Sequence, residues 1–590
     1  MHAETERPPV GRPPCYARAS VKILGIGCSS YHDPSAALLI DGEVVAAAEE
    51  ERFTRRKHAY GQNPVHAARF CLEQAGIGAH EIDLIAYPWS AEIIREKRWE
   101  YARRAFSKSP AKALSALIQR PRLQRRRLDA LHATLRELGI DPAGVEIEFV
   151  EHHLAHASSA FHCSGFESCA ILTADGEGEL TSTLLGEGLA DRSIVKHREV
   201  LKPDSLGHFY STMTEYLGFE SMDGEYKLMG MAPYGEPGKC DLRDMVRLTE
   251  DGFRCDDDRV WVHRKNRFGR HHFSRRMVDE LGPPREGDDL QAPYIHVAAA
   301  TQKLLEDIVL GLVDRYLADV LDRHGGRLAF AGGVALNVRL NRKLIEHPKI
   351  ETLWVQPASS DAGIALGAAT WAAERRGIRV AKLESTALGP EFDAEAVRAA
   401  LQKLRLPYEE LADAAETAAD LLAKGEIVAW FQGRMEFGPR ALGQRSILGH
   451  PGIRGTADEI NQRIKFREKW RPFCPSLLKE RAAEVLDNLH DSPFMTFSFG
   501  VRPEWRARVP EIIHVDGSAR PQLVTETRNP RFYALLKRFE AKTGLPVLIN
   551  TSLNRRGEPI VCSPEHALAM FYGSGLEFLV IEDVLVRKRP

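Results

Sequence analysis

The sequence predicts an α/β protein in which a large N-terminal domain contains two similar strand-rich units, followed by a smaller second domain. The first unit begins with VKILGIG, AALLI and EVVAAAE, and its Asp41-Gly42 turn supplies the positive φ that a tight hairpin needs. A similar strand–turn–strand run, CAILTADGEGELTSTLLGEG, follows at residues 169–188. The length of 590 residues requires at least two domains, because a single hydrophobic core stops growing near about 250–300 residues.

The composition is that of an ordinary globular chain. Lys and Arg number 80 against 82 Asp and Glu, a formal net charge of −2, and 44% of residues are apolar. This balance gives no global electrostatic reason to expect nucleic-acid binding. The sequence contains no uninterrupted apolar run of about 18 residues, so it does not predict a membrane span. The nine cysteines form no CxxC pair, which favours a reducing cytoplasm over a disulfide scaffold. Residues 1–20 are proline-rich without an apolar segment, so we expect a disordered leader.

Three further stretches define the organisation of the chain. Residues 92–139 have a helical pattern crowded with Arg and Lys, and we expect a solvated amphipathic hairpin there in preference to a polyanion site. The aromatic, glycine-rich residues 206–235 predict the wall of a pocket. The stretch VAKLESTALGPEFDAEA, near residue 385, has no clear helix or strand pattern. It predicts the boundary between the N-terminal domain, 21–384, and the second domain, 385–590.

The run EHHLAHASSAFHCSG is the sharpest local signal for a metal. His152 and His156 are four residues apart, so on a helix both imidazoles project from one face and can share an ion. His153 and His156 are a less suitable alternative pair. Asp175 and Asp361 each follow a predicted strand, and such loops converge on the cleft of an open α/β sheet. Two imidazoles and two carboxylates suit Fe²⁺, Mn²⁺ or Zn²⁺.

A glycine pair and a histidine are candidates for nucleotide binding and for acid–base chemistry on a hydroxyl group. Gly332-Gly333 ends a strand before a helix, where a phosphate can approach bare backbone, although tight strand-to-helix packing explains the pair equally well. Asn337, one turn later, could contact a ribose or a base edge. His32, beside Asp33 in the first turn, could be a general base for a hydroxyl group, or it could merely bond its own turn.

The second domain carries arginines among glycine and proline turns. Guanidinium groups in such loops suit bidentate capture of small phosphates. The basic residues of this cluster are Arg434, Arg440, Arg445, Lys465, Arg467, Lys469, Arg471 and Arg520. The strand LPVLINTSLNRRGEPIV ends in polar groups, including Asn550, that could complete the same anion pocket.

With these residues assembled, the chain resembles the O-carbamoyltransferases of the nodulation-protein and antibiotic-tailoring family (NodU/CmcH type). The matching stretches include YHDPSAALLIDGEVVAAAEEERFTRRKH, EHHLAHASSAF, MDGEYKLMGMAPYG, AGGVALN, GRMEFGPRALGQRSILG, KWRPFCPS and NTSLNRRGEPIV. They extend from about residue 21 to the C-terminus. One departure, Cys28-Ser29-Ser30-Tyr31 before the His-Asp pair, leaves nucleotide contacts from that turn open.

The resemblance implies a Kae1-like N-terminal domain of the duplicated actin/Hsp70 (ASKHA) type and a YrdC-like α/β C-terminal domain. It also implies a two-step reaction. The C-terminal domain would make carbamoyl adenylate from carbamoyl phosphate and ATP, and the N-terminal domain would transfer the carbamoyl group to a hydroxyl of a small-molecule natural product. The implied partners are therefore ATP with Mg²⁺, carbamoyl phosphate and a hydroxylated acceptor such as an antibiotic scaffold, in the cytoplasm, without nucleic acid or membrane. A homodimer is only a working assumption.

The resemblance also assigns roles by position. His32 would be the catalytic base. The ligands of an iron ion, for which Mn²⁺ or Zn²⁺ could substitute, would be His152, His156, Asp175 and Asp361. Carbamoyl phosphate and ATP would be bound by Arg440, Lys465, Arg471, Arg520 and Asn550, and the adenylate by Gly332, Gly333 and Asn337. The acceptor would contact Lys57 and Asp223.

Three other functions stay open on the sequence. An ASKHA-type small-molecule kinase or ATPase explains the duplicated domain but leaves the paired histidines and the arginine loops without a role. A tRNA threonylcarbamoyl-type transferase shares both domain types, yet the basic excess here is local. A non-catalytic module that uses a nucleotide as a switch is the third alternative.

Overall fold

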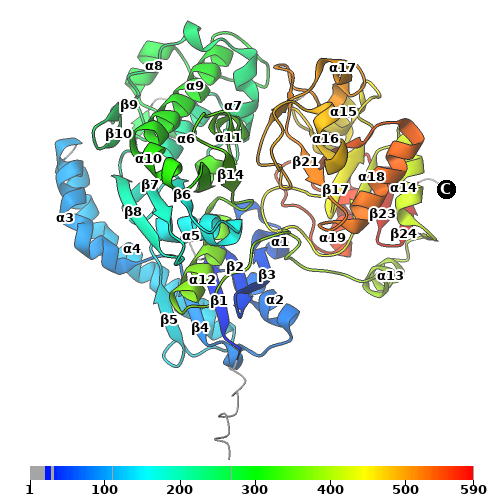
Figure 1. Cartoon of the computed structure of the whole chain (residues 1–590), viewed down its shortest axis with the longest axis horizontal. Helices are drawn as coiled ribbons and strands as arrows, with labels where there is room; N and C mark the ends of the chain where they lie inside the picture. The colour runs from blue at the N-terminus through cyan, green and yellow to red at the C-terminus, as the bar shows by residue number, and fades with distance from the viewer. Residues whose placement is uncertain are drawn as a thin grey trace, which may run out of the picture.

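The computed structural model describes residues 20–27, 32–108, 110–262, 264–266, 269–468 and 470–588. Residues 1–19 of the predicted leader and the Cys28–Tyr31 turn lie outside these ranges. Figure 1 shows an N-terminal body, coloured blue to green, beside a C-terminal body, coloured yellow to red. Within the described ranges, no helix combines the length and the apolar character needed to cross a bilayer.

Two five-stranded sheets with the same topology form the N-terminal body. Their strand orders are β3-β2-β1-β4-β5 and β8-β7-β6-β13-β14. In each sheet the first three strands of the unit are an antiparallel meander, and the last two add in parallel. The strands are β1 (Lys22–Gly27), β2 (Ser35–Ile40), β3 (Glu43–Glu49), β4 (Leu84–Tyr87), β5 (Glu146–Phe149), β6 (Cys169–Ala174), β7 (Thr181–Gly188), β8 (Ile194–Leu201), β13 (Arg327–Ala331) and β14 (Thr352–Val355). The predicted duplicated α/β fold is therefore confirmed.

Two helices, α5 (His152–Ser164) and α12 (Ile364–Arg375), pack against each other between these sheets. Small residues allow the close approach. A Cβ atom on Gly367 of α12 would lie 1.9 Å from the backbone oxygen of Ala155 on α5, and one on Gly25 of β1 would lie 2.0 Å from the oxygen of Ala365. Only glycine fits at both positions, so the spacing of α5, α12 and the first sheet is fixed by the sequence.

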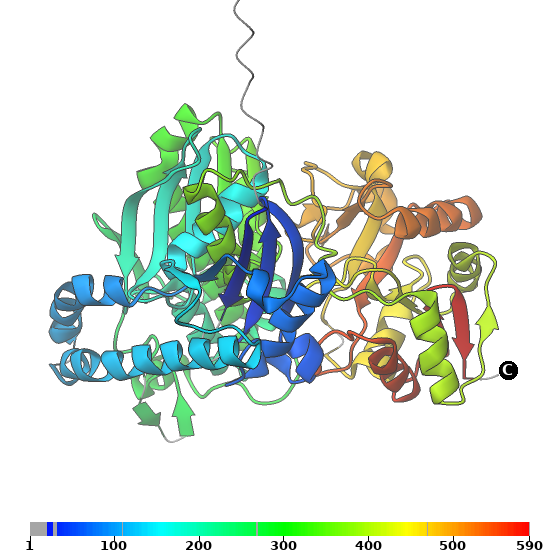
Figure 2. The same cartoon turned by 90° about the horizontal axis from the view of Figure 1, so that it is seen from below.

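The remaining N-terminal elements cover the sheets and the outer edge. The predicted basic hairpin forms α3 (Ala91–Lys108) and α4 (Pro110–Glu137), which lie side by side at the edge of the body (Figures 1 and 2). The predicted pocket wall is broken into α6 (Leu206–Tyr216) and α7 (Glu225–Met231). The other helices and the small hairpins are α1 (Glu51–Thr54), α2 (Val65–Ala75), β9 (Val246–Thr249), β10 (Gly252–Cys255), β11 (Arg264–Asn266), β12 (Gly269–His271), α8 (Arg275–Leu281), α9 (Tyr294–Leu312), α10 (Ala318–Arg323) and α11 (Val338–Ile345).

An eight-stranded mixed sheet organises the C-terminal body, in the order β15-β24-β23-β16-β17-β22-β18-β21. Its strands are β15 (Glu409–Glu410), β16 (Val428–Phe431), β17 (Arg445–Gly449), β18 (Cys474–Leu478), β21 (Gln522–Val524), β22 (Val547–Ser552), β23 (Phe578–Ile581) and β24 (Val584–Arg587), and β19 (Phe499–Gly500) pairs separately with β20 (Ser518–Ala519). The helices are α13 (Ala394–Lys403), α14 (Ala414–Ala423), α15 (Thr456–Glu459), α16 (Ala482–Val485), α17 (Pro503–Arg506), α18 (Pro530–Thr543) and α19 (Pro564–Tyr572).

Buried polar contacts join the two bodies. Glu49 at the end of β3 accepts hydrogen bonds from Arg52, at 3.0 Å, and from the Gly438 amide, at 2.8 Å. Arg52 in turn donates to the Gly438 carbonyl at 2.9 Å, and Arg434 donates to the Val45 carbonyl at 2.9 Å. Because an unpaired charge would be costly in this interface, these contacts favour one relative placement of the bodies.

The contact between α5 and α12 gives the first prediction. We expect Gly367→Ala to lower the free energy of unfolding by about 1–3 kcal/mol, because the new methyl group must push against the Ala155 carbonyl. Thermal unfolding followed by calorimetry would measure this loss. Gly238→Ala is the matched control, since a Cβ there meets nothing within 4 Å. Equal melting temperatures for the two variants would contradict the prediction.

Candidate active site

Four side chains from three segments converge at the N-terminal ends of α5 and α12. The Nε2 atoms of His152 and His156 lie 3.1 Å apart, and each is 3.3 Å from Asp175 Oδ2. Asp361 Oδ1 lies 3.4 Å from the His152 nitrogen and 3.8 Å from the His156 nitrogen. The i, i+4 spacing on α5 therefore does bring both imidazoles to one point, with a carboxylate on either side.

This donor set fits a divalent transition-metal ion. The four ligand atoms lie within 4.8 Å of one another. Two ligands bound at about 2.1 Å and at right angles are about 3 Å apart, which is close to the spacings here. Burial lowers the pKa of His152, but the charges of Asp361 and Asp175 outweigh that effect and raise this pKa to about 10. The negative potential that holds a proton on the imidazole would equally attract a cation.

Backbone amides position this cluster. The Glu179 carboxylate accepts from the amide of His152, at 3.1 Å, and from that of Ser90, at 2.6 Å, and so gives the first amide of α5 a hydrogen-bond partner in a buried setting. The Gly333 amide donates to Asp175 Oδ1 at 3.0 Å, which leaves Oδ2 turned toward the two imidazoles. Glu179 belongs to the DGEGE turn, but its role in capping α5 was not predicted from the sequence.

His32 lies beside the cluster and is oriented by Asp33. Its Nδ1 atom is 3.2 Å from Asp33 Oδ2, and its Nε2 atom is 4.0 Å from Asp361 Oδ2. The other Asp33 oxygen lies 2.8 Å from Nδ1 of His58. Burial lowers the pKa of His32, whereas the hydrogen bond to Asp33 and the charge of Asp361 raise it to about 9 overall. A cation at the carboxylates would oppose these charges and favour the neutral imidazole that a base requires.

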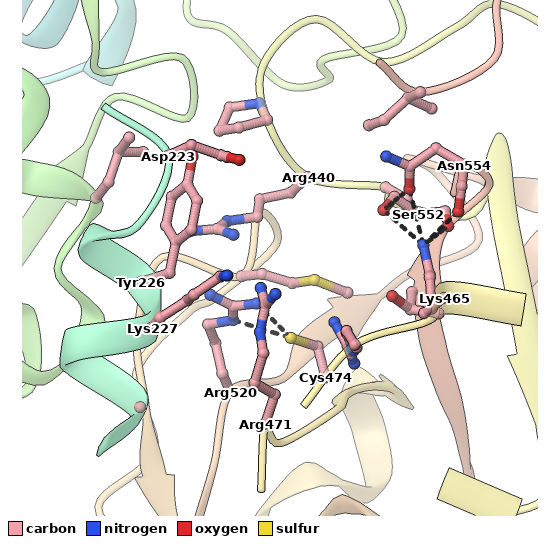
Figure 3. A pocket seen from close by; sticks show the side chains of 18 of the residues that line it. Asp223, Tyr226, Lys227, Arg440, Lys465, Arg471, Cys474, Arg520, Ser552 and Asn554 are labelled. Carbon is pink, nitrogen blue, oxygen red and sulfur yellow. Dashed lines mark hydrogen bonds between the residues drawn. The ribbon is translucent and has the colours of Figure 1, made fainter. Parts of the chain in front are cut away.

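A cavity of about 320 Å³ lies beside this region and reaches into the C-terminal body; its lining includes neighbours of the cluster but not His32 or the four cluster residues themselves. Ser360 and Ala362, on either side of Asp361, line one part of it. The N-terminal body also contributes Asp33, Lys57, His58, Asp223 and Tyr226, and the C-terminal body contributes Arg440, Lys465, Arg471, Arg520 and Asn550. Figure 3 shows the arginines facing α7 across the opening. The sequence-predicted acceptor and phosphate residues therefore share one space.

The C-terminal wall carries positive charge. Arg520 donates from Nε and Nη2 to the Cys474 sulfur, at 3.0 and 2.5 Å, beside Arg471 (Figure 3). The Arg440 guanidinium lies 5.3 Å from the centre of the Tyr226 ring. Burial and the nearby Arg520 charge lower the pKa of Arg440 to about 10. Within the described part of the chain its Nη2 atom has no hydrogen-bond partner, so the guanidinium is available to an anion.

Lys465 and Asn550 form the opposite side of the same wall. Lys465 donates to the Ser552 carbonyl and to the Asn554 side-chain oxygen, the latter at 2.8 Å. Burial, together with the charges of Arg467 and Arg471, holds the pKa of Lys465 well below its usual range. The Asn550 amide nitrogen donates to Ser476 at 2.8 Å.

Two arginines predicted for the anion cluster have structural roles, which corrects that part of the sequence analysis. Arg445 is fully buried and donates to backbone carbonyls, including that of Gln432 at 2.7 Å. Arg434 donates to the Leu388 carbonyl at 2.5 Å and to Val45 in the other body. Their donors are used by main-chain oxygens, so neither is placed to hold a phosphate. Lys469 lies outside the described residues.

Asn337 also needs a correction. Its side-chain oxygen accepts from the Leu340 amide at 3.0 Å and so caps α11, and its nitrogen donates to Gln302 at 2.9 Å. The residue is buried and does not line the cavity. The neighbouring Gly332 has φ of 95°, and a Cβ there would lie 2.2 Å from the Ala174 carbonyl, as tight strand-to-helix packing requires. His153, the alternative ligand, instead bonds Thr173 at 2.6 Å.

Several cavity residues were predicted only as parts of longer motifs, or not at all. Lys57 and Asp223, the predicted acceptor contacts, are ion-paired with each other across the opening. Tyr226 and Lys227 come from the stretch predicted to be a pocket wall, and a helical spacing within it could have identified them. Cys474 belongs to the KWRPFCPS motif, but no role was predicted for it, because its proximity to Arg520 arises only from the fold.

Comparison with known proteins agrees with this arrangement. A family model described as carbamoyltransferase N-terminus matches residues 22–370, and one described as carbamoyltransferase C-terminus matches residues 419–588. The chain belongs to the carbamoyltransferase family. The resemblance to that family and the prediction of a carbamoyl-transferring enzyme are thereby confirmed at this level.

Relatives of this carbamoyltransferase match over most of its length. It is 38% identical to the uncharacterized protein sll1178 of Synechocystis, with 96% of each chain covered. It is 37% identical to the nodulation protein NolNO of Sinorhizobium fredii, covering 95% of this chain and 79% of that protein. It is also 37% identical to the nodulation protein NolO of Bradyrhizobium diazoefficiens, covering 75% and 79%.

Similarity to solved structures is more distant. HypF of T. kodakarensis matches with a TM-score of 0.29 and 12% identity, covering 62% of this carbamoyltransferase and 50% of that chain. MreB 5 of Spiroplasma citri bound to AMPPNP matches with a TM-score of 0.28 and 14% identity, covering 60% and 96%.

The raised pKa of His152 predicts how cation binding depends on pH. An imidazole must lose its proton to become a ligand, so below about pH 10 binding releases one proton. We expect Mn²⁺ affinity, measured by titration, to increase about tenfold per pH unit between about pH 6 and pH 8. Asp361→Asn should abolish tight binding, whereas the exposed-site control Asp307→Asn should retain it. An affinity independent of pH would contradict the prediction.

Proposed function

We propose that this carbamoyltransferase is an ATP-dependent O-carbamoyltransferase that makes carbamoyl adenylate in its C-terminal body and transfers the carbamoyl group in its N-terminal body. The observation that carries the proposal is the shared cavity, because the predicted phosphate ligands line it together with the predicted acceptor contacts Lys57 and Asp223, beside the imidazole–carboxylate cluster. Carbamoyl phosphate and its adenylate react with water, so an enclosed connection between the two places would limit hydrolysis.

The first half-reaction takes place against the arginine wall. Water converts carbamoyl phosphate to carbamate and phosphate, and a carbamate oxygen then attacks the α-phosphorus of ATP, which releases pyrophosphate. Arg440, Arg471 and Arg520 bind the phosphate groups, and their guanidinium forks orient the anions side by side. Mg²⁺ accompanies ATP. Asn550 and Lys465 hold the strand end and the loop that close this side of the cavity.

The second half-reaction takes place beside the imidazole–carboxylate cluster. An acceptor hydroxyl oxygen bonds to the carbamoyl carbon while the bond from that carbon to the adenylate oxygen breaks, and AMP leaves. Asp33 holds the Nδ1 proton of His32, so Nε2 can take the hydroxyl proton. Lys57 and Asp223 contact the acceptor. His152, His156, Asp175 and Asp361 would hold Fe²⁺, Mn²⁺ or Zn²⁺, which would stabilise charge on the departing phosphate.

The alternatives account for less of the structure. A kinase or ATPase would leave the arginines of the C-terminal wall without a role. A nucleotide switch would leave His32, beside the imidazole–carboxylate cluster, without a role. A threonylcarbamoyl-type transferase acting on tRNA would need a basic face around the acceptor opening. At that opening Asp223 is paired with Lys57, and Asp33 lies between His32 and His58, so the local charges offset one another and no basic face is formed by them. The site therefore favours a small hydroxylated acceptor of the kind tailored in natural-product biosynthesis.

The two half-reactions can be separated by mutation. We expect Arg471→Ala to abolish carbamoyl-phosphate-dependent release of pyrophosphate from ATP, because a principal phosphate contact is lost. His156→Ala should retain this release but lose transfer to a hydroxylated acceptor. Pyrophosphate would be measured by a coupled assay, and the product by mass spectrometry, in which a gain of carbamoyl differs from a gain of phosphate.

Arg454→Ala, an exposed arginine of the same body, is the matched control and should keep both activities. Loss of pyrophosphate release in both Arg471→Ala and His156→Ala would contradict the assignment of separate sites. A phosphorylated product would favour the kinase alternative.

A further inference from the structure

The basic hairpin of α3 and α4 has no role in the proposed reaction, yet one of its arginines is buried. Arg127 is 3% exposed, whereas the adjacent Arg126 is exposed. The Arg127 guanidinium carbon lies 3.1 Å from the centre of the Trp89 ring, just beyond the end of β4. A buried guanidinium stacked on an indole contributes packing as well as charge. The hairpin is therefore joined to the centre of the N-terminal body by this stack.

Trp89 transmits the contact to a predicted metal ligand. Its ring meets the His152 imidazole edge to face, with 5.8 Å between centroids and 74° between planes. Among the described residues, His152 Nδ1 has no hydrogen-bond partner. Metal-bound imidazoles are usually oriented by a hydrogen bond at the second nitrogen. The edge-to-face contact with Trp89 makes this indole the candidate for that orienting role.

Two more cations of the hairpin contact acidic residues near the same cluster. Lys97 pairs with Glu199 at 2.5 Å, and Glu199 also contacts Lys196, which pairs with Glu151 immediately before His152. These residues form one continuous ion-pair chain from the hairpin to the start of α5.

Arg104 makes the corresponding contact on the Asp175 side. It pairs with the fully buried Asp204 at 2.9 Å. The next residue, Ser205, donates to the Asp175 carbonyl at 3.0 Å and to the Gly176 carbonyl at 2.7 Å. Lys97 and Arg104 of the hairpin therefore form ion pairs within the protein, beside the segments that supply the metal ligands. These pairs argue against a polyanion site at the two positions.

We propose that the α3–α4 hairpin is a clamp for the metal centre, in which Arg127 holds Trp89 against His152 and fixes the orientation of that imidazole. The inference rests on the proposed metal centre, and both residues are positioning residues with no contact to substrate. Its effect should appear in metal affinity, while adenylate formation at the distant arginine wall should be spared.

Mn²⁺ binding at fixed pH, followed by the electron paramagnetic resonance of the free ion, tests the clamp. We expect Trp89→Leu to weaken binding about tenfold, the lower end of the effect of losing an outer-shell partner. Arg127→Met should also weaken it, even though removal of a positive charge would by itself tighten cation binding. Arg126→Met, the exposed neighbour on α4, should bind as the wild type does.

Carbamoyl-phosphate-dependent pyrophosphate release shows whether each variant is folded. Trp89→Phe, which keeps an aromatic edge, should recover most of the affinity, and it replaces Trp89→Leu if that variant does not fold. Wild-type affinity in both Trp89→Leu and Arg127→Met would overturn the clamp while leaving the metal centre intact. Absence of Mn²⁺ binding in the wild type and in Arg126→Met would instead overturn the metal centre, and the clamp with it.

Discussion

The close approach of α5 and α12 is the constraint on which the candidate site depends. His152 and His156 lie in the first two turns of α5, and Asp361 lies in the short turn just before α12, so the separation of the two helix N-termini sets the distances among these ligands. Gly367 allows the approach because a side chain there would meet the Ala155 carbonyl. Both helix ends carry partial positive charge, and Glu179, Asp175 and Asp361 are placed where that charge stabilises carboxylates.

Opposite charges are gathered at the two ends of one cavity. The cluster beside the N-terminal end has imidazoles among carboxylates, which suits a cation, and the C-terminal end has guanidinium groups, which suits phosphates. The carboxylates would repel a phosphate until a cation occupies the cluster, so the ion is what would let a phosphate-bearing ligand bind there. The proposed intermediate, which carries both a phosphate and an acyl group, is a species that the two sites could hold in turn.

The sequence predicted those features that depend on local spacing. The two histidines of α5 and the strand–turn–strand units follow from helical and strand periodicity, so the ligand pair and the duplicated fold could be predicted. Arg434, Arg440 and Arg445 look alike within GRMEFGPRALGQRS, and only the fold shows which guanidinium groups meet backbone carbonyls. The role of Asn337 could not be predicted for the same reason, because an asparagine uses the same side-chain atoms to cap a helix and to contact a ligand.

The arginine wall is incompletely neutralised by acidic side chains, which is why it suits anions. Glu468 is the acid closest to Arg471, but at 3.7 Å it is also shared with Lys227 of the other body, at 2.8 Å. One carboxylate therefore serves as counter-ion to more than one cation. Burial, together with the charges of neighbouring arginines, lowers the pKa values of Arg440 and Arg467 because both effects disfavour the charged guanidinium. A bound phosphate would relieve this repulsion while it competes with Glu468 for Arg471. Because Glu468 also pairs with Lys227, occupation of the wall by a phosphate would be coupled through this carboxylate to α7, whose residues line the acceptor side of the cavity.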